Sequence, residues 1–344
     1  MKDRMRAIVF QGRHKFGLKD VPVPRPGEKD VLIKVDTCGV CGTDVHIYEG
    51  TFPADFPVII GHEFAGRVEE TGKGVKNFGV GDPVTVDPNT TCEQCEWCRK
   101  GQKHLCPDLV NLGVKVNGGF AEYARVMEAY VYHLPENLDL ELASFTEPLS
   151  CCLHGIDLAQ IKSGDAVVIL GAGPIGLLML QLAKISGAEK VVSVDPLEKR
   201  RNLAIQLGVD LALDPTTTNI VNSVEEFFDG KADRVIECVG SSHTQEDSLA
   251  LIKPGGRVVW FGVADPKAEV RINPFNIYRN EITVLGSFVN PYTTERSIKL
   301  LSSDRIKVKD LVTHRFRLNQ LDEAIKTYLN DKERVKIVMK PWKR

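Results

Sequence analysis

Four cysteines are gathered in one short segment of the chain. Cys92, Cys95, Cys98 and Cys106 form the pattern C-x2-C-x2-C-x7-C. Four thiolates at this spacing can surround one tetrahedral Zn²⁺, and such a set leaves no coordination position open for a substrate. The segment therefore predicts a structural zinc site. Four thiolates can also hold an iron–sulfur cluster, and the plainest alternative is a group of reduced surface cysteines.

A second set of metal-binding residue types is spread over the first 150 residues. It comprises Cys41, His62 and Glu63, with Glu147 as a further acidic candidate. One thiolate, one imidazole and one or two carboxylates suit a Zn²⁺ that keeps a position for water or substrate. The sequence therefore predicts two zinc ions per chain, one structural and one catalytic.

A glycine motif stands between a short apolar run and a stretch of helical periodicity, which is the context in which GxGxxG binds a dinucleotide. It reads Gly171-Ala-Gly-Pro-Ile-Gly176. Gly171 permits a tight turn, Gly173 lets the backbone approach a pyrophosphate, and Gly176 lets the helix lie close to the sheet. Pro174 and Ile175 belong to the start of the helix, whose N-terminus offers free N–H groups to phosphates. We expect this whole turn to bind the cofactor.

The acid at the end of the next apolar run bears on the form of the cofactor. Asp195 can accept hydrogen bonds from both ribose hydroxyls of NAD, and its charge would repel the 2′-phosphate of NADP. Lys199 and Arg200 follow closely and could instead attract that phosphate. We expect NAD, with Arg200 also at the cofactor, and NADP remains the alternative.

The elements that must position these residues change in kind near residue 150. Before it, short alternating runs predict a mostly β domain of Greek-key or barrel-like organisation. After it, strands alternate with helices, which predicts a doubly wound parallel sheet. Beyond Gly286 we expect helices at 293–302 and 318–329 and a β-like run at 335–339 that returns to the first domain. The six strands expected in the parallel sheet are 166–170, 191–194, 211–213, 234–238, 256–261 and 281–285.

Composition limits the class of protein. The chain has 344 residues, of which 43% are hydrophobic and 26% charged, and this length favours two domains of ordinary globular composition. The formal net charge is −2, and without a basic run the chain is not expected to bind nucleic acid or a membrane. No apolar run suits a signal peptide or a membrane span. We expect a cytoplasmic protein.

Taken in order, these motifs resemble the zinc-dependent medium-chain dehydrogenase/reductase family. The resemblance covers essentially the whole chain and rests on Cys41-Gly-Thr-Asp with His46, Gly61-His-Glu63, the four-cysteine segment and the glycine motif. It implies an α/β protein that assembles as a homodimer or homotetramer. A β-rich, GroES-like, partly open barrel (1–150 and 288–344) would carry the structural-zinc lobe (92–106), and a Rossmann domain (151–287) would bind NAD.

The resemblance also implies a catalytic-zinc ligand set. Cys41 and His62 would be ligands, and Glu63 would be a third ligand or lie just behind the ligands. Glu147 stands where alcohol dehydrogenases of this family have a second cysteine, and it would bind the zinc or hold its water. An acid at this position is similar to the polyol (sorbitol-type) and L-threonine dehydrogenases.

Three further roles follow from the same resemblance. Asp44 would orient His62. Thr43 would take the proton of the alcohol, and His46 would pass it towards solvent. The alternative interpretations, without the resemblance, are that Thr43 is a turn residue and His46 a surface histidine.

The expected substrate is a small polyhydroxylated molecule. We expect oxidation of a secondary hydroxyl of a polyol, sugar alcohol or cyclitol to a ketone, with NAD as hydride acceptor. Sorbitol dehydrogenases have Phe-Arg-Tyr after the last Rossmann strand, where this chain has Phe288-Val-Asn290, and this departure argues against sorbitol itself. L-Threonine and a simple secondary alcohol are alternative substrates. A non-catalytic NAD-binding protein is the alternative from another class.

Overall fold

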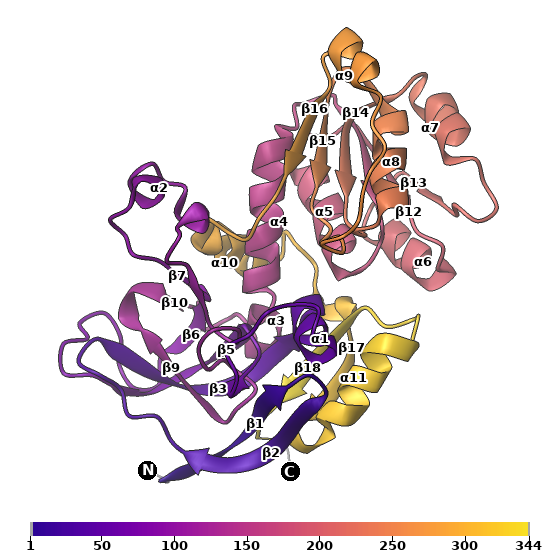
Figure 1. The fold of residues 1–344 in the computed structure, drawn as a ribbon. Helices are drawn as coiled ribbons and strands as arrows, with labels where there is room; N and C mark the ends of the chain where they lie inside the picture. Colours follow the sequence, from indigo (N-terminus) through magenta and orange to yellow (C-terminus); the bar gives the residue numbers. More distant parts are fainter. Residues whose placement is uncertain (1–2, 343–344) are drawn as a thin grey trace. The chain divides into compact units, whose positions relative to one another are not determined.

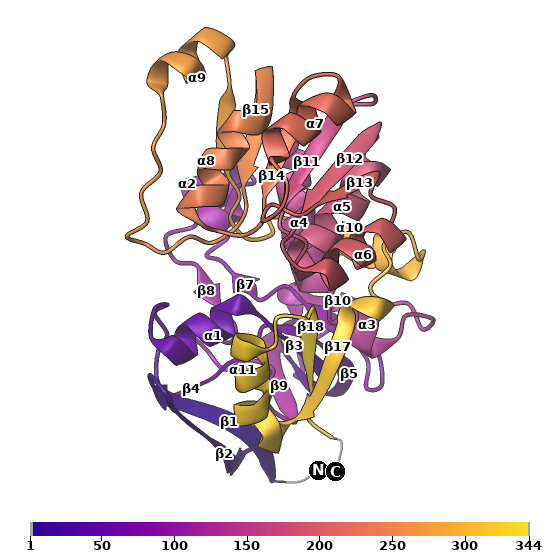
Figure 2. The same cartoon turned by 90° about the vertical axis from the view of Figure 1, so that its right-hand side faces the viewer.

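The structure, a computed structural model, describes residues 3–342 (Figures 1 and 2). It divides into two compact units, each with its own core. The β unit contains the chain up to Ser150 and again from Asn290, and the α/β unit is Cys151–Val289. The observed units divide after residues 150 and 289, and the boundaries expected from the sequence are after 150 and after 287.

The α/β unit is built on one sheet of six parallel strands in the order β13-β12-β11-β14-β15-β16. This order, 3-2-1-4-5-6 in chain terms, is that of a dinucleotide-binding doubly wound sheet. The predicted α/β fold is therefore confirmed. The strands are β11 (Ala166–Leu170), β12 (Lys190–Val194), β13 (Leu211–Leu213), β14 (Ala232–Glu237), β15 (Ile252–Trp260) and β16 (Thr283–Gly286).

Helices flank this sheet and explain why its strands are continuous apolar runs. Figure 1 shows them beside the strands, and side chains such as Val168, Val192 and Val235 are completely buried. A parallel sheet covered on both faces favours such Val- and Ile-rich strands. The helices are α4 (Thr146–Ala159), in which the chain passes from one unit to the other, α5 (Pro174–Ile185), α6 (Glu198–Gln206), α7 (Ile220–Phe228), α8 (Ser242–Leu251) and α9 (Pro274–Asn280).

The β unit is organised around one long strand, β3 (Asp30–Val40). One edge of β3 pairs with β5 (Glu63–Thr71), and the other pairs first with β9 (Tyr123–Met127) and then with β18 (Lys336–Lys340). Figure 1 shows the yellow β18 beside the indigo β3. The sheet continues through β6 (Pro83–Val86) and β10 (Val131–His133) at one end and β17 (Val312–Arg317) at the other.

Smaller elements complete the β unit. Two smaller sheets are β2-β1-β4 and β7-β8. The helical runs expected at 293–302 and 318–329 are found as α10 and as η4 followed by α11. The remaining elements are β1 (Arg4–Gly12), β2 (Lys15–Pro22), β4 (Val58–Ile59), β7 (Asn89–Thr90), β8 (Val110–Asn111), α1 (Gly42–Glu49), α2 (Glu96–Arg99), α3 (Leu140–Ala143), α10 (Thr294–Ser302), α11 (Leu321–Asn330), η1 (Lys103–Leu105), η2 (Glu128–Tyr130), η3 (Lys309–Leu311) and η4 (Leu318–Gln320).

The core of the β unit mixes side chains from both of its chain segments. Ile33 and Phe120 belong to the same buried cluster as Ile325 and Met339. The C-terminal segment is therefore an integral part of the core of this unit. Its strand β18 pairs with one edge of β3, opposite β5.

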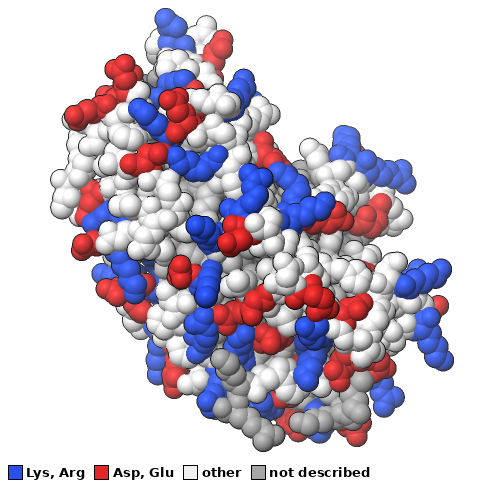
Figure 3. Space-filling view, turned by 180° about the vertical axis from the view of Figure 1, so that it is seen from behind, with Lys and Arg blue, Asp and Glu red and all other residues white. Residues whose placement is uncertain are grey.

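The surface carries both signs of charge. On the face shown in Figure 3, basic and acidic side chains are interspersed. Among the helices of residues 3–342, none combines the length and the apolar character that crossing a membrane requires.

Candidate active site and cofactor site

Two neighbouring strands bring the predicted catalytic-zinc ligands together. Cys41 follows the end of β3 and precedes α1, while Glu63 begins β5 directly after His62. Because Gly39 of β3 pairs with Glu63 of β5, residues distant in sequence meet at this end of the sheet. One ligand atom from each of Cys41, His62 and Glu63 lies within 4.8 Å of the others.

The chemistry of this group fits a zinc ion. A thiolate, an imidazole and a carboxylate are the usual zinc donors, and bonds of about 2.0–2.3 Å place tetrahedral ligands roughly 3–4 Å from one another. Three protein donors leave one position for water or substrate. The observed cluster is compatible with such an ion after small side-chain adjustments.

Asp44 links the Cys41 backbone to the His62 ring. Its Oδ2 accepts a hydrogen bond from the Cys41 N–H at 2.9 Å, which caps α1. Its Oδ1 lies 3.7 Å from His62 Nδ1, and neither of these two buried atoms has a hydrogen-bond partner among the described residues. This arrangement leaves Nε2 for a metal and directs Nδ1 at a carboxylate, as is common for metal-binding histidines.

Charges around this cluster shift the pKa values of its members. Burial raises the pKa of Asp44 to about 6, although the His62 charge acts to lower it. Burial acts to lower the pKa of His62, but the charges of Cys41, Asp44 and Glu147 outweigh it and raise that pKa well above its ordinary value. A concentration of negative groups around one imidazole is what a bound cation would satisfy.

Glu147 lies close to the cluster but outside the group of three. It is buried in the first turn of α4, and its charge acts on both His62 and Lys336. Thr43 is in the first turn of α1, with Oγ1 3.8 Å from the Cys41 sulfur. His46 is exposed on the same helix.

The outer histidine has a partner that the sequence did not suggest. His46 Nδ1 lies 3.2 Å from Thr51 Oγ1, and the Thr51 N–H donates to the His46 carbonyl. Residues three apart on a helix are neighbours, so Thr43 and His46 share one side of α1. The contacts thus join Thr43 to Cys41 at one end of this side of α1 and Thr51 to His46 at the other.

Lys336 is the residue at this site that sequence reasoning missed. Its ammonium donates to Glu63 Oε2, and both side chains are buried. Burial acts to lower the pKa of Lys336, but the charges of Glu63, Cys41 and Glu147 outweigh it and raise that pKa above its ordinary value. The available signal was one lysine inside the otherwise apolar run of residues 335–339, since a charged residue in a buried strand requires a partner.

The four cysteines of the predicted structural site also converge. One sulfur from each lies within 4.8 Å of the others, and all four are free thiols. Cys92 Sγ lies 3.5 Å from Cys106 Sγ and accepts the Cys95 N–H at 3.3 Å. Zn–S bonds of about 2.3 Å place tetrahedral sulfurs roughly 3.8 Å apart, so this cluster fits a zinc ion. N–H donors from Gln94 and Cys95 lower the pKa of Cys92, which favours its thiolate.

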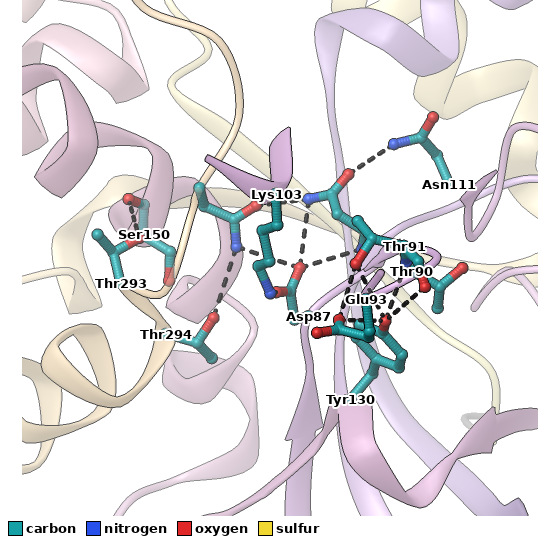
Figure 4. A network of polar contacts seen from close by, with 12 residues as sticks. Asp87, Thr90, Thr91, Glu93, Lys103, Asn111, Tyr130, Ser150, Thr293 and Thr294 are labelled. Carbon is teal, nitrogen blue, oxygen red and sulfur yellow. Dashed lines mark hydrogen bonds and ion pairs between the residues drawn. The ribbon is translucent and has the colours of Figure 1, made fainter. Parts of the chain in front are cut away.

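A buried polar network fastens this lobe to the β unit (Figure 4). Lys103, from the segment between the third and fourth cysteines, pairs with Asp87 at 2.7 Å. Asn89 donates to both Asp87 and Asn290, and Asn290 donates to Asp87. Asn290 is the residue at which the chain re-enters the β unit. The lobe and the re-entry point therefore share one hydrogen-bonded network.

The glycine motif has the local geometry that a dinucleotide requires. Gly171 has φ +93°, and a Cβ there would lie 2.7 Å from Val239 Cγ2. A Cβ on Gly176 would overlap the Gly171 carbonyl oxygen, whereas the nearest atom to a Cβ on Gly173 is Arg200 Nη1 at 3.9 Å. Gly173 therefore presents open backbone. It caps α5 without a side-chain hydrogen bond, and the helix N-terminus can receive phosphate.

Pro174 and Ile175 form the first turn of α5, and both are half-buried. Because proline has no N–H and a pre-set φ, it suits the first position of a helix. The first turn therefore begins directly at the open backbone of Gly173.

Asp195 stands at the end of β12 beside this turn. Its Oδ2 accepts the Ala172 N–H at 2.8 Å and its Oδ1 accepts the Leu197 N–H at 2.9 Å. Arg200 Nη1 lies 3.8 Å from Oδ2. A carboxylate can accept about four hydrogen bonds, so Asp195 retains capacity for ribose hydroxyls. Arg200 therefore lies near both the Asp195 carboxylate and Gly173, while Arg201 Nη1 donates to the Asp195 carbonyl at 2.8 Å.

Glu237 organises the loop after β14 that packs against the glycine motif at Gly171. The sequence analysis did not single it out. It ends β14 completely buried, and its Oε1 accepts hydrogen bonds from the N–H groups of Val239 and Gly240 and from Thr244 Oγ1. These bonds fix the turn that brings Val239 against Gly171. An acid at the end of an apolar strand was the sequence signal.

Two known sequence families match the chain. The alcohol dehydrogenase GroES-like domain matches residues 27–136, and the zinc-binding dehydrogenase domain matches residues 174–303. The first match covers Cys41, His62 and the four cysteines, and the second begins within the glycine motif.

Several named relatives align along nearly the whole chain. D-arabinitol dehydrogenase 1 of Uromyces fabae is 34% identical, with 98% of this chain and 97% of the relative covered. Sorbitol dehydrogenase of Halalkalibacterium halodurans is 36% identical, covering 98% and 99%. L-threonine 3-dehydrogenase of Pyrococcus furiosus is 36% identical, covering 94% and 95%.

Solved structures agree with these relatives. A zinc-binding dehydrogenase from Sinorhizobium meliloti 1021 bound to NADP superposes with a TM-score of 0.96 at 38% identity, covering 99% of this chain and 100% of that one. An alcohol dehydrogenase from E. coli CFT073 complexed with NADH gives 0.93 at 29% identity, with 99% and 100% covered. The chain therefore belongs to the zinc-binding medium-chain dehydrogenases, and it is an alcohol or polyol dehydrogenase that uses zinc and a nicotinamide dinucleotide.

Proposed function

We propose that this enzyme oxidises a secondary hydroxyl of a polyol, sugar alcohol or cyclitol to a ketone, passing the hydride to NAD. The observation that carries the proposal is the convergence of Cys41, His62 and Glu63 beside Thr43, with the acid Glu147 close by. An acid at position 147 in place of a cysteine resembles the polyol dehydrogenases. The relatives that act on sorbitol and D-arabinitol support the same substrate class.

Cys41, His62 and an acid would hold the catalytic zinc, and Cys92, Cys95, Cys98 and Cys106 would hold the structural one. Bound zinc supplies Lewis-acid polarisation of the substrate hydroxyl, and NAD supplies the hydride acceptor. Thr43 takes the hydroxyl proton, since its Oγ1 is beside the Cys41 sulfur. His46 moves the proton outward, with Thr51 holding the ring at Nδ1. Asp44 orients His62.

Asp195 and Arg200 are the residues that set the choice of cofactor in this proposal. The carboxylate of Asp195 favours ribose hydroxyls and disfavours a 2′-phosphate. Its pairing with Arg200 directs one nearby guanidinium at the carboxylate, which further favours NAD. Similar chains have been solved with NADP as well as NADH, so the preference is a quantity to measure.

Position 290 argues against sorbitol within the proposed class. At the position of Asn290, sorbitol-type dehydrogenases have the tyrosine of their Phe-Arg-Tyr run. Asn290 is 1% exposed, and it exchanges hydrogen bonds with Asn89 and Asp87. A side chain engaged in this way contributes no hydrogen bond to a sugar hydroxyl. A polyol recognised by other groups is therefore favoured.

L-Threonine is the second candidate substrate. It is favoured by the 36% identity to an L-threonine 3-dehydrogenase and by the Thr43-Asp-Val-His-Ile-Tyr48 segment, which resembles that group. A simple secondary alcohol is the third.

A substrate screen tests the proposal directly. NADH formation is followed with polyols, cyclitols, polyol phosphates, L-threonine and secondary alcohols in a zinc-replete preparation. The proposal expects the highest kcat/KM for a polyol or cyclitol. A clearly higher value for L-threonine or a simple alcohol contradicts the substrate, and no turnover with any of them favours the non-catalytic alternative. Light scattering checks the proposed homodimer or homotetramer.

A further inference from the structure

We propose that Lys336 is a positioning residue that keeps Glu63 a one-oxygen, displaceable partner of the catalytic zinc. The proposal rests on the zinc ligand set proposed above but not on the identity of the alcohol. Lys336 holds one carboxylate oxygen of Glu63 and leaves only the other for a metal.

Three adjacent strands create this contact. Glu63 opens β5 and pairs with Gly39 of β3, and Gly39 pairs with Val338 of β18. Lys336 begins β18, so it reaches Glu63 across the end of β3. A Cβ on Gly39 would overlap Glu63 Oε2 and lie 2.9 Å from Lys336 Cε. The absence of a side chain at residue 39 therefore makes room for the ion pair.

The ion pair is closed off from solvent. Glu63 is 2% exposed and Lys336 4% exposed. Lys336 donates to Oε2, whereas the group of metal donors formed with Cys41 and His62 needs only one carboxylate oxygen. A buried charge-assisted hydrogen bond of this kind is strong and has a defined geometry, so Glu63 cannot readily turn both oxygens towards a metal.

Lys336 also supplies positive charge to the whole donor cluster. Its charge acts on Asp44 and on Cys38, and the charges of Cys41 and Glu147 act on it in turn. A lysine so placed opposes a bound dication and reduces the negative charge that Glu63 presents to it. The consequence is a more weakly bound metal whose open position stays available to the substrate.

Replacing Lys336 by methionine removes the charge while keeping an unbranched chain. We expect Lys336→Met to lower the dissociation constant of the catalytic zinc about tenfold or more, measured by competition with a chromophoric chelator on the full chain. With Co²⁺ in place of zinc, we expect a changed visible spectrum, because Glu63 becomes a stronger ligand. Turnover should fall, since the open position is then contested.

The chain offers a matched control four residues along the same strand. Lys340 ends β18 and is paired with acids, Asp36 at 3.0 Å and Glu141 at 3.2 Å. Lys340→Met should leave the zinc dissociation constant and the Co²⁺ spectrum unchanged. Lys336→Arg should keep the zinc affinity of the unmodified protein, because an arginine retains the ion pair with Glu63.

A second change identifies Glu63 as the intermediary. Relative to Glu63→Gln alone, the double variant Lys336→Met with Glu63→Gln should gain much less zinc affinity than Lys336→Met gains over the unmodified chain, because only the direct repulsion between the lysine and the ion is then removed. An unchanged or weaker affinity in a folded Lys336→Met protein overturns the proposal. If Lys336→Met fails to fold, Lys336→Gln replaces it, and an affinity no tighter than that of Lys336→Arg overturns the proposal equally. Both readouts are taken without alcohol, so a wrong substrate class would appear only in the turnover screen.

Discussion

Lys103 Nζ lies 2.7 Å from Asp87 Oδ2, and both side chains are almost completely removed from solvent. The lysine belongs to the four-cysteine lobe and the aspartate follows β6 in the main body of the β unit. The ring of Tyr292 lies 4.7 Å from the same ammonium. One buried ion pair therefore fastens the lobe, and Figure 4 shows the hydrogen bonds that extend it.

Removing one partner of this pair should be costly. We expect Lys103→Met to lower the free energy of unfolding by about 3–5 kcal/mol, because Asp87 is left buried and uncompensated. Urea unfolding measures the effect. Lys100→Met is the control, since Lys100 is exposed and pairs with Glu96 on the surface, where the loss should be less than about 1 kcal/mol. Equal losses in the two variants would contradict the prediction.

The two metal sites should respond differently to loss of a thiol. Elemental analysis should give about two zinc equivalents per chain for the unmodified protein. Cys95→Ser should cost stability or assembly, because a closed zinc site contributes folding energy. Cys41→Ser should abolish turnover while thermal unfolding changes little. The division of roles fails if both substitutions damage folding to the same degree.

Asp195 should govern discrimination between NAD and NADP. We expect Asp195→Ala to raise the KM for NAD and to reduce the bias against NADP, because hydrogen bonds to ribose worth about 1–3 kcal/mol are lost. The measurement is kcat/KM with each cofactor. Should the unmodified enzyme already prefer NADP, Lys199 or Arg200 governs the pocket, and Lys199→Ala or Arg200→Ala would then cause the larger change.

Thr43 should contribute through its hydroxyl alone. Thr43→Val preserves shape, so zinc content should be unchanged while kcat falls about 10²-fold or more, the scale of a positioned proton-transfer group. His46→Gln should have a smaller effect, mainly at acid pH, because water can partly replace an exposed relay. A Thr43→Val enzyme with near-normal turnover would remove the threonine from the mechanism.

Glu141 predicts a pH-dependent contribution to stability. Arg315 donates to both of its carboxylate oxygens, and Lys340 lies 3.2 Å away. Burial acts to raise the pKa of Glu141, but these partners lower it below its usual value. A carboxyl whose pKa is lower in the folded state than in the unfolded state stabilises the fold at pH values above the unfolded-state pKa. This contribution is lost as the pH falls through the folded-state pKa.

We therefore expect Glu141→Gln to lower the free energy of unfolding at pH 7 by about 1 kcal/mol, a modest figure because Arg315 is partly exposed. The difference between the two proteins should vanish on acidification, when the wild-type carboxyl is protonated in both states. A difference that stays constant between about pH 3 and pH 7 would contradict the ion pair as its source.

Local patterns were sufficient to predict the α/β unit. Its six strands follow six apolar runs, the central ones are buried, and the GxGxxG context ties the first strand to the first helix. Even the three-residue strand 211–213 was expected at its observed place. Sequence periodicity reports such units well because strand, turn and helix follow one another.

The contacts around the candidate metal site were less accessible from sequence. Cys41, His62 and Glu63 are residue types that commonly bind metals, so the sequence indicates them as candidates. Their grouping in space, however, depends on the register between β3 and β5. Lys336 carries no such signature, and its role depends on β18 pairing with β3 across nearly the whole chain length. Asn290 likewise gains its network only through contacts with Asp87 and Asn89, about 200 residues earlier in the chain. Long-range pairing of this kind leaves little trace in local composition.

The position of β18 between β3 and β17 has a consequence for the order in which the protein matures on the ribosome. The α/β unit is one continuous segment and can fold as soon as it has emerged. The second half of β3 must wait for β18, which is made roughly 15 to 60 seconds later at about 5–20 residues per second. During that interval Glu63 lacks its lysine and one strand edge stays unpaired. The metal site is therefore among the last parts of the nascent chain to reach its final electrostatic state.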